Sequence, residues 1–364
     1  MESSSAERNP ILKDVGQQVI YYGGDDGLHE TEEETVQLNV YKRSLGERYF
    51  FKYIKKMHLF FLLVISLTVM VYMSFATPLP LSFNYDKINT IISFGDSYTT
   101  RYLDMKSLSY ACRNCTSAGG PNWVIYLTDT TNWISWDFAY NSAPINNNIV
   151  NQAPTVIDVS TQVRDLYPKI FVSPTEEISD IVASKYKDMM RTPESTLTTI
   201  WVGINDIDLT YDYADTDALD SKIMQAYQVL IDELINEGVH QFMLINVPPI
   251  DRAPMWHNTR NENLIRSRVR GYNEKLKIMI EGLKKGHPKD TFFEYDAWSY
   301  FNMLMDNPKP YNMTDIDTFC PDWAHPEENN CKPIEEYFWL NDLHPTFHVH
   351  ELLAKDIQRY LRSQ

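Results

Sequence analysis

The sequence contains few cysteines and few basic residues for its length. Four cysteines among 364 residues are too few for a small fold that depends on disulfides. The 33 lysines and arginines are outnumbered by 49 acidic residues, which gives a formal net charge of -16 at pH 7. Nucleic acid and anionic lipid surfaces are therefore poor electrostatic partners, and a neutral substrate is expected.

The first part of the chain lacks the apolar patterning of a folded core. Residues 1–56 are predicted to be a disordered extension, because they contain the acidic stretch Glu30–Glu34 and a Gly-Gly-Asp-Asp-Gly cluster at 23–27. An uncharged apolar run, Leu59–Met73, follows three lysines, and small residues come after it. Residues 57–76 are therefore predicted to be a signal peptide or a signal anchor.

Two interpretations of this run remain open. A run of about 15 residues is shorter than the roughly 20 needed to span a bilayer, which favours a signal peptide cut after Ala76 and a secreted protein. The alternative is a type II membrane anchor over residues 59–76 with its basic flank in the cytosol. Both place residues 77–364 outside the cytosol, where the sequons at Asn114 and Asn312 could carry glycans.

The four cysteines form two local pairs. Outside the cytosol, Cys320 and Cys331 are expected to form a disulfide that closes a loop near the C-terminus. For Cys112 and Cys115 the alternatives are a bridge, a free pair or a metal site. No second Cys-x-x-Cys motif supplies further ligands, so no metal is predicted.

Strand-like and helix-like segments alternate from residue 89 onward. This alternation predicts an α/β fold, a three-layer α/β/α sandwich with a mostly parallel central sheet, in one domain over residues 77–364. Strands are predicted at 89–95, 195–202, 240–247 and 291–295, and helical stretches at 121–128, 154–167, 216–237, 262–285 and 352–361.

The stretch Ile91–Thr99 is an apolar strand that runs into a tight Gly-Asp-Ser turn. Ser97 is therefore held at the carboxyl end of a strand, where ligands bind in open α/β sheets. A hydroxyl fixed in that position is a candidate nucleophile if a base lies within reach.

Three other stretches carry residue types suited to the same chemistry. Gly120, in Gly-Gly-Pro-Asn, could bring a backbone N–H close to a substrate, because no Cβ intervenes. Asn205, in Gly-Ile-Asn-Asp, follows a predicted strand and could donate its amide to an oxyanion. His344, in Asn-Asp-Leu-His-Pro, is the candidate base. Each motif alone is weak evidence for a catalytic site. Together, in this order and at the ends of strands, they indicate one.

Together these motifs resemble the SGNH, or GDSL, hydrolase superfamily over roughly residues 88 to 360. The fungal secreted acetylesterase-like branch, carbohydrate esterase family 16, is the most similar, through the segments Asp137–Tyr140, Asn246–Pro249 and Leu304–Pro308 and the pair Cys320 and Cys331. The resemblance implies the flavodoxin-like SGNH hydrolase fold. It also implies a serine esterase without metal or organic cofactor, acting on short-chain, above all acetyl, esters of plant cell-wall carbohydrates. A lipase or phospholipase and a catalytically weakened surface protein are the alternatives.

In that family Ser97 would be the nucleophile and His344 the base. The N–H groups of Ser97 and Gly120 and the amide of Asn205 would form the oxyanion hole. One position departs from the family, because the triad acid three residues before the histidine is Asn341 here. A local shift that lets Asp342 serve is the preferred prediction, a Ser-His dyad is the second, and an inactive relative is the third.

Arginine, tryptophan and histidine residues outside these motifs are further candidates for the neighbourhood of the site. Arg101, four residues after Ser97, could reach the pocket mouth, although a surface position is the simpler expectation. Trp256 and Trp323 could stack on a sugar ring. His348 and His350 are expected to be packing or surface residues rather than bases.

Overall fold

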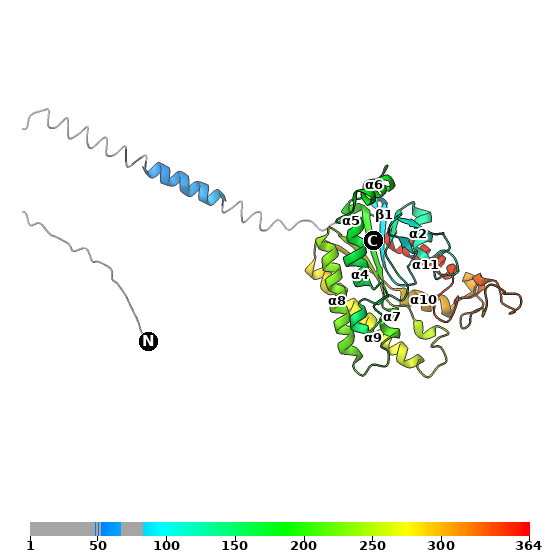
Figure 1. Ribbon diagram of the computed structural model, residues 1–364. Coiled ribbons are helices and arrows are strands. Elements are labelled where there is room, and N and C mark those ends of the chain that lie inside the picture. The colour runs from blue at the N-terminus through cyan, green and yellow to red at the C-terminus, as the bar shows by residue number, and fades with distance from the viewer. Residues whose placement is uncertain (1–47, 49, 51, 67–82) are drawn as a thin grey trace, which may run out of the picture. The chain divides into compact units, whose positions relative to one another are not determined.

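The computed structural model describes residues 48, 50, 52–66 and 83–364, and the chain divides into two units, Met1–Thr77 and Pro78–Gln364. In the first unit, residues 52–66 are helical (Figure 1). Among the residues just given, no helix is both long and apolar enough to cross a membrane. The predicted disordered extension, residues 1–56, therefore ends too late, because residues 52–56 belong to this helix. Residues 1–47 and the predicted cleavage site after Ala76 lie outside the described residues.

A five-stranded parallel sheet forms the centre of the second unit. Its strand order is β4 (Ile134–Asp137), β1 (Thr90–Gly95), β5 (Thr196–Trp201), β6 (Gln241–Ile245) and β7 (Thr291–Tyr295). Every residue of β1, β5 and β6 is buried, as expected for parallel strands covered on both faces. The predicted parallel sheet is confirmed.

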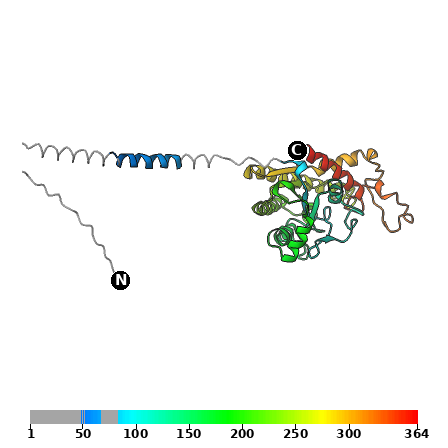
Figure 2. The same ribbon diagram turned by 90° about the horizontal axis from the view of Figure 1, so that it is seen from above.

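Helices cover both faces of the sheet. The connections β5–β6 and β6–β7 run through α8 (Thr216–Asn236) and α9 (Glu262–Gly286), and right-handed crossovers place both helices on one face. The connection from β1 to β4 runs the other way through α2 (Trp123–Thr131), so α2 lies on the opposite face, where it packs against α11 (Phe347–Arg362). Figures 1 and 2 show these layers, which confirm the α/β sandwich.

The remaining elements are short. They are η1 (Tyr85–Lys87), β2 (Leu103–Asp104), β3 (Ser109–Tyr110), α3 (Asn147–Val150), α4 (Val159–Thr161), η2 (Gln162–Leu166), α5 (Tyr167–Phe171), α6 (Glu176–Lys185), η3 (Pro193–Ser195), α7 (Ile204–Asp208), η4 (Ile250–Arg252), α10 (Ala297–Asp306), η5 (Lys309–Tyr311) and η6 (Ile334–Glu336).

Several boundaries differ from the prediction. The four-residue edge strand β4 was not predicted, because a run this short has no recognisable period. The last helix begins at Phe347 instead of residue 352, because its first turn contains two histidines and lacks an apolar stripe. The early start matters for function, since α11 begins three residues after His344.

Candidate active site

Ser97 lies in a turn directly after the central strand β1. The Asp96 carboxylate accepts a hydrogen bond from the Tyr98 N–H (3.0 Å), and the Asp96 carbonyl accepts from the N–H groups of Thr99 (3.1 Å) and Thr100 (3.0 Å). These bonds close the turn and leave the half-buried Ser97 hydroxyl at the carboxyl edge of the sheet. The position agrees with the place where parallel α/β sheets bind ligands.

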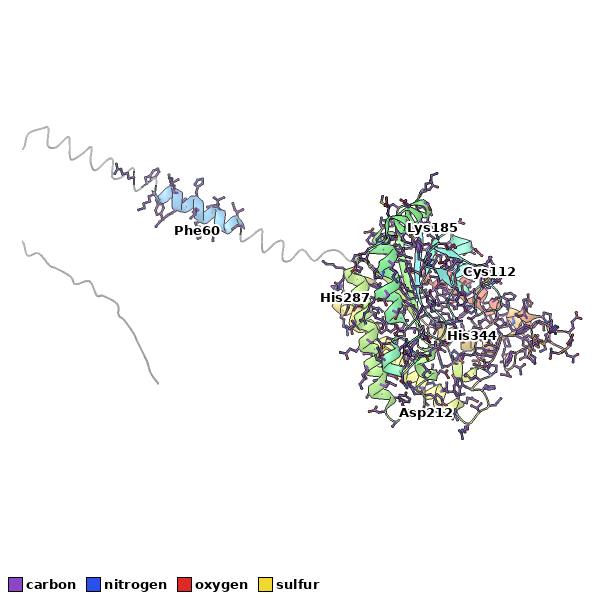
Figure 3. All side chains as sticks on the ribbon, in the orientation of Figure 1. Phe60, Cys112, Lys185, Asp212, His287 and His344 are labelled. Carbon is purple, nitrogen blue, oxygen red and sulfur yellow. A yellow bond between two sulfur atoms is a disulfide. The ribbon has the colours of Figure 1, made fainter. Side chains whose placement is uncertain are left out.

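His344 lies against Ser97 although 247 residues separate them. The His344 Nε2 atom is 2.8 Å from the Ser97 Oγ atom. The loop that carries the histidine is closed by a hydrogen bond from the Leu340 N–H to the His344 carbonyl (2.7 Å). Nucleophile and base are therefore already at hydrogen-bonding distance (His344 is labelled in Figure 3).

The side chain of Asn341 holds the other nitrogen of the imidazole. Its Oδ1 atom is 3.1 Å from His344 Nδ1 and also accepts from the N–H groups of His344 (2.8 Å) and Leu343 (3.0 Å). Backbone N–H groups can only donate, so the atom that faces them is the amide oxygen. It therefore accepts from Nδ1–H, which leaves Nε2 free to accept the Ser97 proton.

Asp342 does not take the position predicted for it. Its side chain is exposed, and the imidazole nitrogen that a triad acid would contact is bonded to Asn341. In this turn the residue three positions before the histidine, Asn341, faces Nδ1, whereas Asp342, two positions before it, does not contact the imidazole. The structure thus corrects the expectation that a local shift brings Asp342 onto His344.

The Asp342 carboxylate nevertheless acts on His344 electrostatically, without contacting the imidazole. Burial lowers the pKa of His344 below its ordinary value, and the Asp342 carboxylate acts in the opposite direction. His350, the buried histidine of α11, is also neutral, because burial lowers its pKa to about 3. The base is therefore a neutral imidazole at neutral pH.

Two groups predicted for an oxyanion hole come from separate segments, a loop and the short helix α7. The Gly120 N–H donates no hydrogen bond to another residue in the described part of the chain. A Cβ at Gly120 would lie 2.8 Å from Phe347 at the start of α11, so only glycine fits there. Asn205, on α7, donates one amide hydrogen to the Ala143 carbonyl (3.1 Å), and its second hydrogen is available.

Tyr98 links the two halves of the site and was not singled out from the sequence. Its hydroxyl donates to the carbonyl of Leu343 (2.6 Å), the residue before His344. The ring is buried, with its centre 5.6 Å from the imidazole of His344 and 5.3 Å from the ring of Trp201. No local sequence pattern predicts this contact, because it joins residues 245 positions apart.

Trp323 supports the histidine loop from outside. Its indole N–H donates to the Leu340 carbonyl (2.6 Å), next to Asn341, and it belongs to the loop closed by the disulfide Cys320–Cys331. The predicted disulfide between Cys320 and Cys331 is confirmed, and of the alternatives left open for Cys112 and Cys115 the structure shows the bridge. Figure 3 marks Cys112 on the domain.

Two buried carboxylates lie below the nucleophile and the oxyanion residue. Burial raises the pKa of Asp96 to about 7, and the nearby Asp206 adds to the rise. Burial also raises the pKa of Asp206 to about 7, although the Ile145 N–H bonded to it acts against the shift. Asp96 and Asp206 are the sequence neighbours of Ser97 and Asn205. Because their pKa values differ between the folded and unfolded chain, their protonation makes the free energy of unfolding depend on pH.

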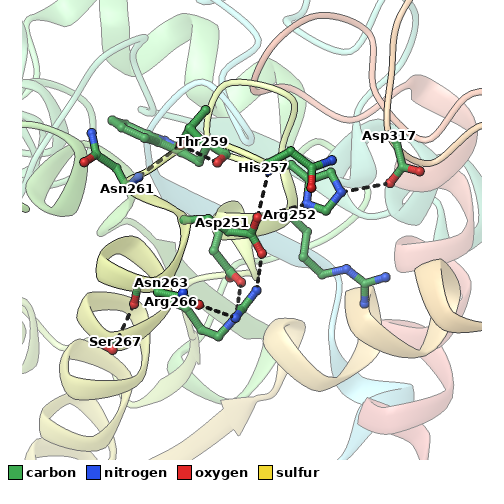
Figure 4. A network of polar contacts seen from close by, with 12 residues as sticks. Asp251, Arg252, His257, Thr259, Asn261, Asn263, Arg266, Ser267 and Asp317 are labelled. Atoms are coloured by element: carbon green, nitrogen blue, oxygen red, sulfur yellow. Dashed lines mark hydrogen bonds and ion pairs between the residues drawn. The ribbon is translucent and has the colours of Figure 1, made fainter.

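A polar network fixes the loop that flanks the histidine turn (Figure 4). The Met255 N–H donates to the Asp342 carbonyl (2.8 Å), which ties the segment after η4 to the turn. Within that segment Asp251 accepts from Arg266 Nε (2.8 Å), and His257 Nε2 lies 3.6 Å from an Asp317 oxygen. The histidine turn is therefore bonded to a segment that is itself held by several polar contacts.

The other candidates take structural positions. Arg101 stacks on the ring of Tyr110, 3.9 Å from its centre, and is not a free surface arginine. Trp256 is buried against Tyr211, so it cannot stack on a sugar. His348 Nε2 contacts the Tyr311 carbonyl (2.7 Å) and His350 is buried, as expected of packing residues.

The family model of GDSL-like lipase/acylhydrolase matches residues 91–357, which contain all the motifs above. The chain belongs to this family. The protein is accordingly a carboxylic ester hydrolase. Within the described residues, no group of three or more histidine, cysteine or acidic side chains is arranged to hold a metal ion.

Similar proteins include two fungal acetylesterases. That of Thermothelomyces thermophilus is 27% identical over 283 residues, covering 73% of this chain and 86% of its own. That of Hypocrea jecorina is 22% identical over 326 residues, covering 75% and 88%. The acetylxylan esterase Axe2 of Geobacillus stearothermophilus aligns with a TM-score of 0.40 and 15% identity, covering 76% of this chain and 96% of its own.

Proposed function

We propose that this GDSL hydrolase is a serine esterase that removes short acyl groups, acetyl foremost, from carbohydrates, with Ser97 as its nucleophile. The observation that carries the assignment is the 2.8 Å contact between Ser97 Oγ and His344 Nε2 at the carboxyl edge of the sheet. The acetylesterases among its relatives support the acyl group, and the acidic chain suits a neutral carbohydrate.

The reaction follows from these contacts. Ser97 Oγ attacks the ester carbonyl carbon while its proton passes to His344 Nε2, and a tetrahedral oxyanion forms. The carbon–oxygen bond to the alcohol then breaks, and His344 gives its proton to the leaving oxygen. A water molecule repeats the same sequence on the acyl-enzyme, which releases the acid and restores Ser97.

The oxyanion of this proposed reaction needs hydrogen-bond donors near Ser97. We assign this role to the N–H groups of Ser97 and Gly120 and to the free amide hydrogen of Asn205. In acyl transfer, removing one such donor costs about 2.7 to 4 kcal/mol of transition-state stabilisation. Catalysis here therefore depends on three groups held by three separate segments of the chain.

Asn341 is proposed to orient the base without neutralising it. Its amide oxygen accepts from Nδ1–H and so selects the tautomer that can receive the serine proton. It carries no charge to balance the imidazolium that forms during the reaction. Asp342 supplies a partial substitute, since its carboxylate raises the pKa of His344 from a distance.

We also propose that the hydrolase domain acts outside the cytosol. All four cysteines of the chain are in disulfides, which persist in oxidising compartments. N-terminal sequencing of protein from culture medium should give a mature chain that starts at or near Thr77. Recovery of the intact chain only from a detergent-extracted membrane fraction would establish the anchor instead.

The function is tested with the substitution Ser97→Ala and a short p-nitrophenyl ester. Hydrolysis should fall by about 10⁴-fold or more, because the nucleophile is lost. The circular dichroism spectrum and the melting temperature should stay unchanged, since Ser97 contributes little to the core. Activity near that of the wild type would refute the assignment of the nucleophile.

A further inference from the structure

A polar hollow opens between η4, α9 and α10, beside the network of Figure 4. Its volume is about 570 Å³, within the range of roughly 300–1,000 Å³ typical of ligand sites. A second hollow of about 410 Å³ adjoins it and shares Arg270, Trp298 and Ser299 with it. We call the two together the α9–α10 groove.

The groove reaches the carboxyl ends of the last two strands. Asn246 and Asp296, which follow β6 and β7 directly, line its second hollow. The groove therefore reaches the same edge of the sheet as Ser97. The loop that carries Asp251 and His257 also contacts the histidine turn, through the hydrogen bond from Met255 to Asp342.

The charges of the larger hollow balance each other. Its cationic guanidinium groups are those of Arg252, Arg266 and Arg270, and its carboxylates are those of Asp251, Glu262 and Asp306. Arg266 pairs with Asp251 (2.8 Å) and Arg252 with Asp306 (2.6 Å). A charged ligand would have to disrupt these pairs, whereas a neutral ligand would not.

Two groove residues have buried polar atoms that make no hydrogen bond within the described part of the chain. They are the Oδ1 atom of Asp251 and the indole N–H of Trp298. Asp251 is only 3% exposed. Buried polar groups are normally satisfied, so unsatisfied ones that line one hollow point to a ligand with hydrogen-bonding groups.

The chemistry of the unsatisfied atoms identifies the class of ligand. Asp251 offers an acceptor and Trp298 a donor, and a hydroxyl group can serve both because it donates and accepts. The half-buried ring of Trp298 adds an apolar wall, with the guanidinium of Arg270 5.8 Å from the ring centre. A neutral ligand with many hydroxyls and an apolar face is a carbohydrate.

We infer that the α9–α10 groove binds an unesterified stretch of the carbohydrate whose acyl group is cleaved at Ser97. This inference rests on the proposed function, because it assigns the groove to the same substrate. A polysaccharide that enters at the groove would present a neighbouring esterified sugar to the edge of the sheet where Ser97 and His344 lie. A small ester would reach Ser97 without touching the groove.

Binding is tested on the Ser97→Ala protein, which cannot turn substrate over. Unesterified xylohexaose, cellohexaose and mannohexaose are titrated separately by calorimetry, and at least one should bind with saturation. Met303→Trp fills the larger hollow from an exposed position on α10, and Trp298→Ala removes the aromatic wall. Each should weaken binding about fivefold or more, equivalent to losing one hydrogen bond or ring contact.

Met189→Trp is the matched control, because Met189 is 38% exposed and Met303 is 39% exposed, and Met189 does not line the groove. It should leave binding unchanged. In protein with Ser97 intact, Met303→Trp should raise the KM for the acetylated form of the oligosaccharide that binds about fivefold at unchanged kcat. The same variant should leave hydrolysis of p-nitrophenyl acetate unaltered.

The outcomes separate the inference from the proposed function. Absence of saturable binding by all three sugars, or binding that Met303→Trp leaves unchanged, overturns the groove assignment, and this variant decides the case if Trp298→Ala fails to fold. Retained hydrolysis by Ser97→Ala would instead overturn the nucleophile. In that event the binding data would still report on the groove.

Discussion

Ser97 and Asn205 lie just after the ends of two strands, whereas His344 lies in a loop positioned by contacts from distant parts of the chain. The turn of Ser97 closes on its own backbone, and Asn205 is the second residue of α7, which begins three residues after β5 ends. The histidine turn depends on Tyr98, Trp323 and the segment after η4. The strand-end side of the site is thus locally encoded, and the histidine side is assembled by tertiary structure.

The largest expected effect comes from removing the base. His344→Ala should lower kcat by about 10⁴-fold or more, and the double variant with Ser97→Ala should be no worse than either single one, because the pair acts as a unit. Steady-state hydrolysis of p-nitrophenyl acetate measures all three proteins. Multiplying defects in the double variant would mean that the two residues work independently.

On the strand-end side, Asn205→Ala should lower kcat by about 10²- to 10³-fold through the loss of one oxyanion donor. The KM should change little, since the donor acts mainly in the transition state. The substitution also leaves the Ala143 carbonyl without its partner, so a melting curve is needed alongside the kinetics. A normal kcat would remove Asn205 from the oxyanion hole.

On the histidine side, Tyr98→Phe should lower kcat about tenfold by releasing the Leu343 carbonyl and loosening His344. Tyr227→Phe is the matched control, because the Tyr227 hydroxyl is buried and makes no hydrogen bond within the described residues. The control should keep its kcat. Equal kinetics of the two variants would show that the Tyr98 hydroxyl does not position the base.

Stability should depend on pH through the buried carboxylates. The pKa values of Asp96 and Asp206 are raised to about 7 from an ordinary value of 3.8. The folded chain therefore holds protons that the unfolded chain releases, and this contribution to the free energy of unfolding falls as pH rises from about 4 to 7. Urea unfolding should show a smaller loss over that range in Asp96→Asn than in the wild type.

The smallest expected effect concerns the acidic side of the pH–rate profile, where kcat/KM rises with pH. The reaction requires neutral His344, whose pKa is lowered by burial and raised by Asp342. Asp342→Asn removes the opposing effect, so the rise of kcat/KM with pH should move to lower pH by a fraction of a unit. An unchanged limb in a pH–rate profile would show that the Asp342 charge does not reach the base.

The same contrast explains which features were predictable from sequence. Two central strands, rich in β-branched and aromatic residues, run into Gly-Asp-Ser and Gly-Ile-Asn-Asp, so strand, turn and candidate residue can be predicted from neighbouring positions. Tyr98 as a link to Leu343 and Trp323 as a support of Leu340 depend on contacts that no local pattern contains. The choice between Asn341 and Asp342 likewise needed the geometry of the turn, since the two are adjacent in sequence.

The most direct test of this account compares turnover in Asn341→Ala and Asp342→Asn. We predict the larger loss, about ten- to a hundredfold in kcat, for Asn341→Ala, because the imidazole then loses the acceptor that selects its tautomer. Asp342→Asn should lose less than about threefold, since its carboxylate acts only at a distance. The reverse ranking would contradict the account and make Asp342 the working acid.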